Sequence, residues 1–245
     1  IREGADWKRV VFTGDLGRRG LPILRDPQRV EGCDVLITES TYGNRVHPAA
    51  DDIKQHLKRI LKVATERKSR VVIPAFSLGR TQTLVYFLNE LFNEGELPSI
   101  PVFVDSPLSK SITAVYKHHA DVMDSDFQRV LKGDKDPFAF PGLKYVATQQ
   151  ESVSLNHRKG PFVVIAASGM CEAGRVVHHL RHAIEDPDNI IVLIGFQAEN
   201  TLGRKLQDRW RTVRIFDRLV ELVRDIAAMV RERHCSNRHP DRKDF

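Results

Sequence analysis

The chain has 245 residues, which is enough for one large or two small domains with a substantial buried core. Hydrophobic residues make up 41% of the chain and charged residues 29%, a composition that is typical of folded soluble proteins and excludes a disordered one. The net charge of +6 is compatible with an anionic partner such as nucleic acid, but it does not identify that partner.

Short apolar segments alternate with amphipathic segments along most of the chain. The predicted strands cover residues 9–13, 34–38, 70–74, 101–105, 143–147, 161–167, 189–195 and 212–216. The predicted helices cover residues 51–67, 80–93, 109–122, 149–157, 172–184 and 218–232. Several strands carry Val and Ile at consecutive positions, as strands buried on both faces do. This alternation predicts an α/β fold with a parallel, doubly wound sheet, whose ligands bind outside the carboxyl ends of the strands.

The longest apolar runs, at 162–167 and 190–196, are far shorter than the roughly 20 residues that span a bilayer, so the sequence predicts no membrane segment. The three cysteines are too far apart in sequence for a disulfide framework or a CxxC metal site. This cysteine usage favours the reducing environment of the cytoplasm.

Acidic residues stand at the carboxyl ends of three predicted strands. Asp15 follows the first strand in VVFTGDLG, and Glu39 follows the second in VLITESTYGN. We expect both on the same rim of a sheet, where a carboxylate can ligate a metal, orient a histidine or act as a base. For either residue alone, capping of a turn is an equally good interpretation. Asp105, in VFVDSPLS, is at least as well explained as a cap of the following helix.

A Gly-Arg pair recurs at strand-to-helix junctions. The three pairs are Gly79-Arg80, Gly174-Arg175 and Gly203-Arg204. A cation in the first turn opposes the helix dipole, so helix preference alone does not favour arginine there. A bound phosphate reverses that argument, because it accepts from free backbone N–H groups and from the guanidinium. Ser77 and Ser168 add hydroxyl donors nearby, and the alternative is that these arginines lie on solvated faces.

Histidine clusters in the sequence give weaker signals. His178 and His182 have the i, i+4 spacing of a two-histidine metal site, but HHLRH lacks the glutamate of HExxH, which favours a surface or partly packed pair. His234, Cys235 and His239 have no fourth ligand at a recognised spacing, so we interpret 232–245 as a solvated tail. Dinucleotide, nucleoside triphosphate and serine-hydrolase motifs are absent from the sequence.

Six segments occur in an order that resembles the β-CASP branch of the metallo-β-lactamase-fold nucleases, over residues 9 to about 216. They are VVFTGDLGR, VLITESTYGNR, VVIPAFSLGRTQ, VFVDSPLS, VVIAASGMCEAGRVVHHL and IVLIGFQAENTLGRKL. The chain is most similar to bacterial and archaeal relatives of the cleavage and polyadenylation specificity factor nuclease. The resemblance implies a two-zinc centre that activates a water to cleave an RNA phosphodiester. Asp15 matches the metal-bridging aspartate, and Glu39 matches the acid that orients a histidine.

The resemblance divides the chain into a partial metallo-β-lactamase αββα portion (1–45), a β-CASP domain (46–216) and an atypical helical tail (217–245). The family's HxHxDH motif and its later serine-alanine-histidine segment do not occur in this sequence. We therefore interpret the chain as a fragment whose one zinc ligand is Asp15, and we expect it to hold no zinc and to be inactive alone.

The resemblance implies RNA, in single-stranded form, as the partner, with a homo-oligomer as a further possibility and no role for a membrane. Three alternatives stay open at this point. The chain could be a non-catalytic RNA-binding β-CASP subunit or a DNA-directed β-CASP nuclease. If the resemblance is accidental, it could be a free-standing doubly wound enzyme acting on a phosphorylated metabolite.

Overall fold

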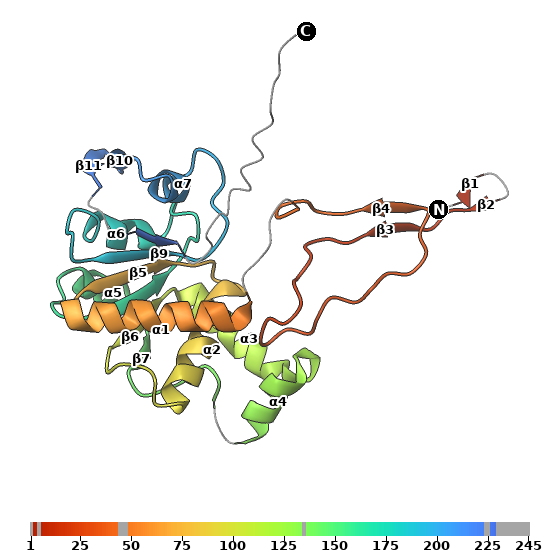
Figure 1. Ribbon diagram of the computed structural model, residues 1–245, viewed down its shortest axis with the longest axis horizontal. Coiled ribbons are helices and arrows are strands. Elements are labelled where there is room, and N and C mark those ends of the chain that lie inside the picture. The colour runs from red at the N-terminus through yellow and green to blue at the C-terminus, as the bar shows by residue number, and fades with distance from the viewer. Residues whose placement is uncertain (1, 4–5, 44–48, 134–135, 223–225, 229–245) are drawn as a thin grey trace, which may run out of the picture.

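The computed structural model describes residues 2–3, 6–43, 49–133, 136–222 and 226–228. Within these residues the centre of the molecule is a six-stranded parallel sheet in the order β12-β9-β5-β8-β6-β7 (Figure 1). Its strands are β5 (Arg70–Pro74), β6 (Val102–Asp105), β7 (Leu143–Tyr145), β8 (Phe162–Ala166), β9 (Ile190–Leu193) and β12 (Ile226–Ala228). The predicted parallel, doubly wound sheet is thus confirmed.

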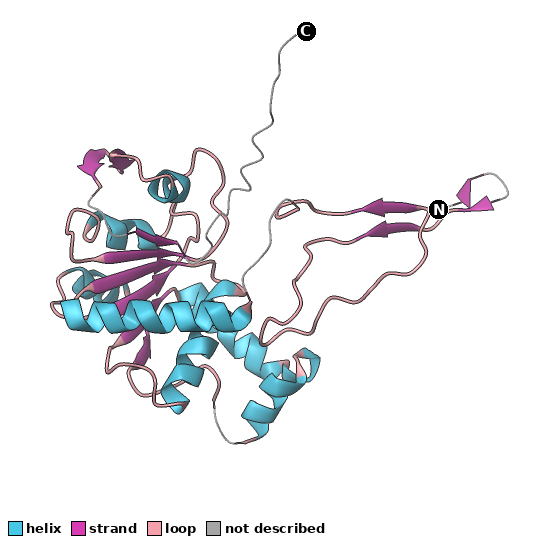
Figure 2. Ribbon diagram, viewed as in Figure 1, coloured by secondary structure: helices cyan, strands magenta, loops and turns pink. Residues whose placement is uncertain are grey.

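Helices cover both faces of this sheet (Figure 2). They are α1 (Ala50–Arg67), α2 (Arg80–Asn93), α3 (Pro107–His118), α4 (Ser125–Lys132), α5 (Gln149–Asn156), α6 (Arg175–Arg181) and α7 (Leu202–Gln207), with a 3-10 turn, η1 (Ala120–Val122). Val71 and Ile73 of β5 pack with α1 to α4, whereas Val72 packs with α5 to α7, because successive side chains of a strand point to opposite faces. In the part of the chain that the structure describes, no helix has the length and apolar character needed to cross a membrane.

Local sequence signals explain which face of α1 is buried and where α3 starts. Helix α1 buries an apolar stripe at Leu57, Ile60, Leu61 and Ala64, which recur at the i, i+3, i+4 spacing of one helix face. Helix α3 starts after Ser106, whose Oγ accepts a hydrogen bond from the Ser109 backbone N–H at 3.1 Å. The cap of this helix is therefore Ser106, and the interpretation of Asp105 as the cap is wrong. Asp105 ends β6 and is left available for other contacts.

A second, smaller parallel pair precedes the main sheet and projects from the α/β body in Figure 1. Strand β3 (Val10–Phe12) pairs with β4 (Val35–Ile37), and the short strands β1 (Arg2–Glu3) and β2 (Asp6–Trp7) pair antiparallel nearby. Phe12 of β3, at 74%, and all three apolar residues of β4 are exposed, whereas Val10 and Val11 are half-buried. Parallel strands are ordinarily covered on both faces, so this pair offers an apolar surface for another layer.

The prediction of a helix over 218–232 is wrong for the residues described there. Strand β11 (Arg218–Glu221) forms an antiparallel hairpin with β10 (Thr212–Ile215), and Ile226–Ala228 joins the main sheet beside β9. Val220 is 1% exposed and its neighbour Leu219 is 62% exposed, which is the alternation of a strand. The main sheet therefore extends into the region expected to be a helical tail. Helix α4 was not expected, and α6 is shorter than the predicted 172–184.

The alternation in β11 can be tested by paired substitutions. Val220→Ala should lower the free energy of unfolding by about 2 kcal/mol because it removes buried methyl groups from the core. Leu219→Ala on the exposed face should change it by less than about 0.5 kcal/mol. Urea denaturation followed by circular dichroism measures both values, and equal losses for the two variants would contradict the strand assignment.

Candidate functional site

The carboxyl ends of three central strands lie level with one another. Ala166 of β8 is paired in register with Pro74 of β5 on one side and with Asp105 of β6 on the other. The turns that follow these strands, together with the turn after β9, cover residues 75–80, 105–107, 167–175 and 194–201, and we call them the carboxyl edge. Ser77, Arg80, Ser168 and Arg175 all lie on these turns or begin the helix that follows. The topology therefore gathers polar groups that are up to about a hundred residues apart in sequence.

Asp105 is the centre of a buried polar network at this edge. Its Oδ2 lies 2.6 Å from His179 Nε2 and accepts a hydrogen bond from Ser152 Oγ at 2.5 Å. Its Oδ1 accepts from Arg175 Nη1 at 2.5 Å. The second ring nitrogen of His179 lies 2.9 Å from Asn156 Oδ1. Strand β6 and helices α5 and α6 are thereby joined through one carboxylate.

The protonation of Asp105 follows from these contacts. The side chain is completely buried, and burial by itself raises the pKa of a carboxyl group. The hydrogen bonds from His179, Ser152 and Arg175 favour the ionised form more strongly, and they hold the pKa of Asp105 below its usual value. The network therefore contains a buried carboxylate ion with donors on both oxygens.

Ser77 and Arg80 lie on the turn between β5 and α2. The Oγ atoms of Ser77 and Ser106 are 3.0 Å apart, so the hydroxyls that follow β5 and β6 meet at the edge. Gly79, the N-cap residue of α2, has a φ of 77° and supplies no side chain to the helix N-terminus. Helix α2 thus begins with Arg80 and has no side-chain cap, and its first two backbone N–H groups, of Arg80 and Thr81, donate to the carbonyls of Leu78 and Phe76. Phosphate binding at this turn stays a prediction.

Arg18 is a further cation at this place that the sequence interpretation missed. It is partly buried, and burial lowers the pKa of its guanidinium, with repulsion from Arg80 as the next cause. An anion bound near both guanidinium groups would lessen their mutual repulsion. The signal in the sequence was weak, because Arg18 lies in the chain segment after Asp15, far from Arg80 in sequence.

Ser168 and Gly174 shape the loop between β8 and α6. The buried Oγ of Ser168 has no hydrogen-bond partner within the described residues. Gly174 has a φ of 83°, and a Cβ atom there would collide with the backbone of Ala167. Only glycine fits this close approach, so the loop can return tightly enough to place Arg175 at the carboxyl edge.

Arg204 has different surroundings from the other two predicted arginines. Its Nε donates to Asp208 Oδ2 at 2.8 Å, and both side chains are partly exposed. Thr201 Oγ1 accepts from the Arg204 backbone N–H at 3.1 Å, and the carboxylate of Glu172 accepts from the Leu202 backbone N–H. A protein carboxylate thus already lies at the N-terminus of α7.

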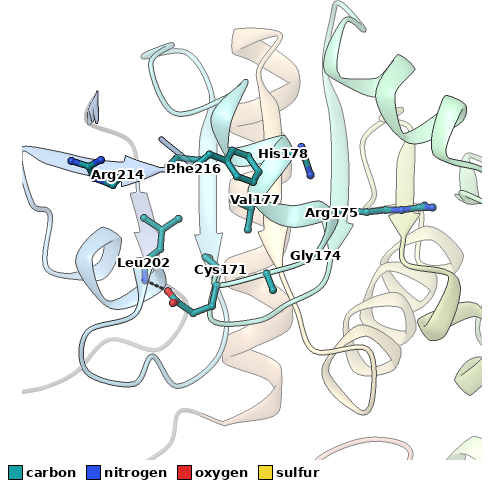
Figure 3. A pocket seen from close by; sticks show the side chains of 11 residues that line it. Cys171, Gly174, Arg175, Val177, His178, Leu202, Arg214 and Phe216 are labelled. Atoms are coloured by element: carbon teal, nitrogen blue, oxygen red, sulfur yellow. Dashed lines mark hydrogen bonds between the residues drawn. The ribbon is translucent and has the colours of Figure 1, made fainter. Parts of the chain in front are cut away.

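A cavity of about 460 Å³ lies between the start of α6 and the end of β10 (Figure 3). Cys171, Leu202 and Phe216 line it, and burial raises the pKa of the Cys171 thiol to about 12, which excludes a thiolate nucleophile near neutral pH. In Figure 3 the side chain of Arg175 extends away from Cys171 and Leu202. Arg175 thus lines one side of the cavity, and its guanidinium pairs with Asp105.

Asp15 and Glu39 lie together at the ends of β3 and β4. Glu39 Oε1 accepts from the backbone N–H of Leu16, next to Asp15, at 2.6 Å, and Oε2 accepts from Thr41 Oγ1 at 2.8 Å. These hydrogen bonds, that from Thr41 first, lower the pKa of Glu39. Tyr42, which follows, packs edge-on against Phe196 after β9, with ring centroids 5.9 Å apart. This contact links the turn after β4 to the carboxyl edge.

The side chains present do not fit a two-zinc centre. Within the described ranges, no group of three or more His, Cys, Asp and Glu side chains is arranged to hold a metal ion. Asp15 is exposed, and the two oxygens of Glu39 are occupied by protein donors. His182 contacts His157, with ring centroids 5.9 Å apart, which agrees with a partly packed histidine. His234, Cys235 and His239, which we interpret as part of a solvated tail, lie outside the described residues.

Comparison with known proteins finds a matching family model and several relatives. The family model described as "Beta-Casp domain" matches residues 81–206. The chain is 34% identical over 215 residues to "Ribonuclease TTHA0252" of Thermus thermophilus, covering 87% of this chain and 49% of that protein. It is 34% identical over 212 residues to "Transcription termination factor FttA" of Methanosarcina mazei, covering 83% of this chain and 32% of that protein.

A eukaryotic relative is more distant. The chain is 29% identical over 201 residues to "Endoribonuclease ysh1" of Schizosaccharomyces pombe, covering 80% of this chain and 26% of that protein. The chain therefore spans half or less of the length of each of these three relatives.

The buried state of Asp105 leads to a pH-dependent prediction. Because its pKa is lower in the folded chain, Asp105 stabilises the fold above the unfolded-state pKa, and this contribution is lost as pH falls through the folded pKa. Asp105→Asn should lower the free energy of unfolding by roughly 3 kcal/mol near neutral pH, and the gap to the wild type should narrow below about pH 4.

Asp208→Asn is the matched control, since it removes an exposed partner of Arg204 and should cost less than about 1 kcal/mol. Urea denaturation at several pH values measures both variants. A gap for Asp105→Asn that stays constant down to the acid limit would contradict an ionised, paired Asp105.

Proposed function

This chain belongs to the β-CASP family of metallo-β-lactamase-fold nucleases, and we propose on that basis that it is the RNA-binding part of an RNA-processing nuclease. The observation that carries the proposal is the gathering of Ser77, Arg80 and Arg175 at the carboxyl edge. In a parallel sheet this is where a ligand binds, and the cations there suit a phosphate chain.

The proposed contact is with the RNA backbone. Arg80 and Arg18 supply positive charge, and the hydroxyl of Ser77 is a further donor. Such groups hold phosphates and do not distinguish bases, so we propose binding of single-stranded RNA without sequence preference. We propose the same role for Ser168, in the turn after β8, and for Arg175 and Arg204, in the first turns of α6 and α7.

The hydrolytic part of the proposal concerns the complete enzyme. We propose that Asp15 is the metal-bridging ligand of a two-zinc centre and that Glu39 orients a histidine there. The described side chains do not form such a centre. A non-catalytic RNA-binding subunit is the alternative to a nuclease. In the complete enzyme, two zinc ions would supply Lewis-acid chemistry for activating water and stabilising charge on the phosphate. We place the protein in the cytoplasm, in keeping with Cys33 and Cys171, which are both free.

Metal content tests the incomplete zinc site directly. The purified chain should contain well under one zinc ion per molecule by elemental analysis, because Asp15 alone cannot hold a dinuclear site. It should also lack chelator-sensitive nuclease activity on single-stranded RNA. Two bound zinc ions per chain would overturn this expectation.

Salt dependence tests the phosphate contacts. Affinity for an oligouridylate should fall steeply with salt, and Arg80→Ala should reduce the slope of log K against log salt by about 1 without changing sequence preference. Arg158→Ala, which removes the same charge from the opposite edge before β8, is the control and should leave the slope near its wild-type value.

The alternatives give different results in the same titrations. Equal affinity for an oligothymidylate would support the DNA-directed nuclease, since no reader of the 2′-hydroxyl is then required. Saturable binding of a small phosphorylated metabolite, with salt-insensitive and weak binding of RNA, would contradict the proposed function.

A further inference from the structure

Two side chains of α6 contact the same buried carboxylate, that of Asp105. Arg175 and His179 are one helical turn apart, so they lie on one face of the helix, and both contact Asp105 of β6. Arg175 approaches Oδ1 and His179 approaches Oδ2. Each of the two side chains therefore contacts a different oxygen of the carboxylate.

The imidazole of His179 is fixed in place. It is 1% exposed, and its Nε2 donates to Asp105 because an ionised carboxylate only accepts hydrogen bonds. Its other ring nitrogen contacts Asn156 on α5, at 2.9 Å. The neighbouring His178 on the same helix is exposed and instead packs against Phe216, with ring centroids 4.8 Å apart. Only one of the two adjacent histidines belongs to the network.

Arg175 differs from its buried partners because a quarter of its side chain is exposed. A guanidinium has five N–H donors, and the contact with Asp105 is made by Nη1. Donors on the exposed side can therefore meet a ligand while Asp105 holds the group from behind. Arg204, in contrast, is paired with the partly exposed Asp208, and such a surface pair restrains an arginine weakly.

We propose that His179 is a positioning residue that acts through Asp105 to hold the guanidinium of Arg175 at the carboxyl edge, ready for an RNA phosphate. The inference rests on the proposed function and adds a residue that does not touch the ligand. Holding Arg175 in advance removes rotamer entropy that binding would otherwise have to overcome.

Because His179 and Arg175 contact different carboxylate oxygens, His179 influences how Arg175 binds Asp105. When His179 donates to Oδ2, Arg175 is held through Oδ1 alone, and its outer donors stay exposed. Loss of the His179 donor leaves Oδ2 with Ser152 and with room for a second arginine contact. Arginine and carboxylate favour a bidentate pair, so Arg175 then turns inward and withdraws donors from the ligand.

Substitutions of His179 test the inference by fluorescence anisotropy with a labelled oligouridylate. His179→Leu should weaken binding about tenfold and lower the salt slope by about 1, as Arg175→Ala does. The double variant should lose no more than Arg175→Ala alone, because both changes remove the same phosphate contact. His179→Gln keeps a donor near the Nε2 position and should bind within about twofold of the wild type. His178→Leu, the matched control on the exposed side, should bind like the wild type.

Several outcomes separate this inference from the proposed function. If Arg175→Ala weakens binding and His179→Leu does not, or if the two losses add, the inference is wrong and the proposed function stands. If neither Arg80→Ala nor Arg175→Ala changes the affinity, the proposed function itself fails.

A measurement on the wild-type chain covers the case in which His179→Leu does not fold. The Arg175 side-chain N–H signals in a nitrogen-15 NMR spectrum should show slow guanidinium rotation before RNA is added and should shift on titration. A freely rotating Arg175 guanidinium in the RNA-free chain would overturn the inference.

Discussion

The buried carboxylate of Asp105 is the constraint on which the rest of the carboxyl edge depends. A charge with no exposure to solvent destabilises a fold unless donors surround it, so the chain must bring His179, Ser152 and Arg175 to the end of β6. Those three donors come from two helices that pack on the same face of the sheet. Satisfying one carboxylate therefore also ties α5 and α6 to the end of β6.

The sheet has an apolar interior that stabilises the fold and a polar carboxyl edge that presents cations. Its interior is apolar on both faces, with Val71 and Val72 packing against different sets of helices, and this rigid body positions the polar turns. Cations then collect at one end of it, where Arg18 and Arg80 repel each other and Arg175 is held by Asp105. Under the proposed function, a phosphate chain relieves that repulsion, which gives affinity without any contact to bases.

The sequence predicted well what depends on local pattern. The stripe on α1 and the Val- and Ile-rich strands produced the parallel sheet, because periodicity reports burial within one element. Local pattern does not reveal contacts between residues that are far apart in the chain. The sequence favours Asp105 as a helix cap because its partner His179 lies 74 residues away and leaves no signal near Asp105. The short apolar run around Val220 is compatible with either a helix or a strand. It forms a strand because it pairs with β10. Ser77, Arg80 and Arg175 do come together at the predicted edge, and their binding of phosphate stays a prediction.

The most direct measurement of the central claim is hydrogen–deuterium exchange of the chain with and without single-stranded RNA. Binding at the carboxyl edge predicts slower exchange in the turns around 76–83 and 168–177, with little change in the turns at the opposite end of the sheet, around 95–100 and 157–161. Protection confined to that opposite end, or no protection at a concentration where RNA is bound, would contradict the account.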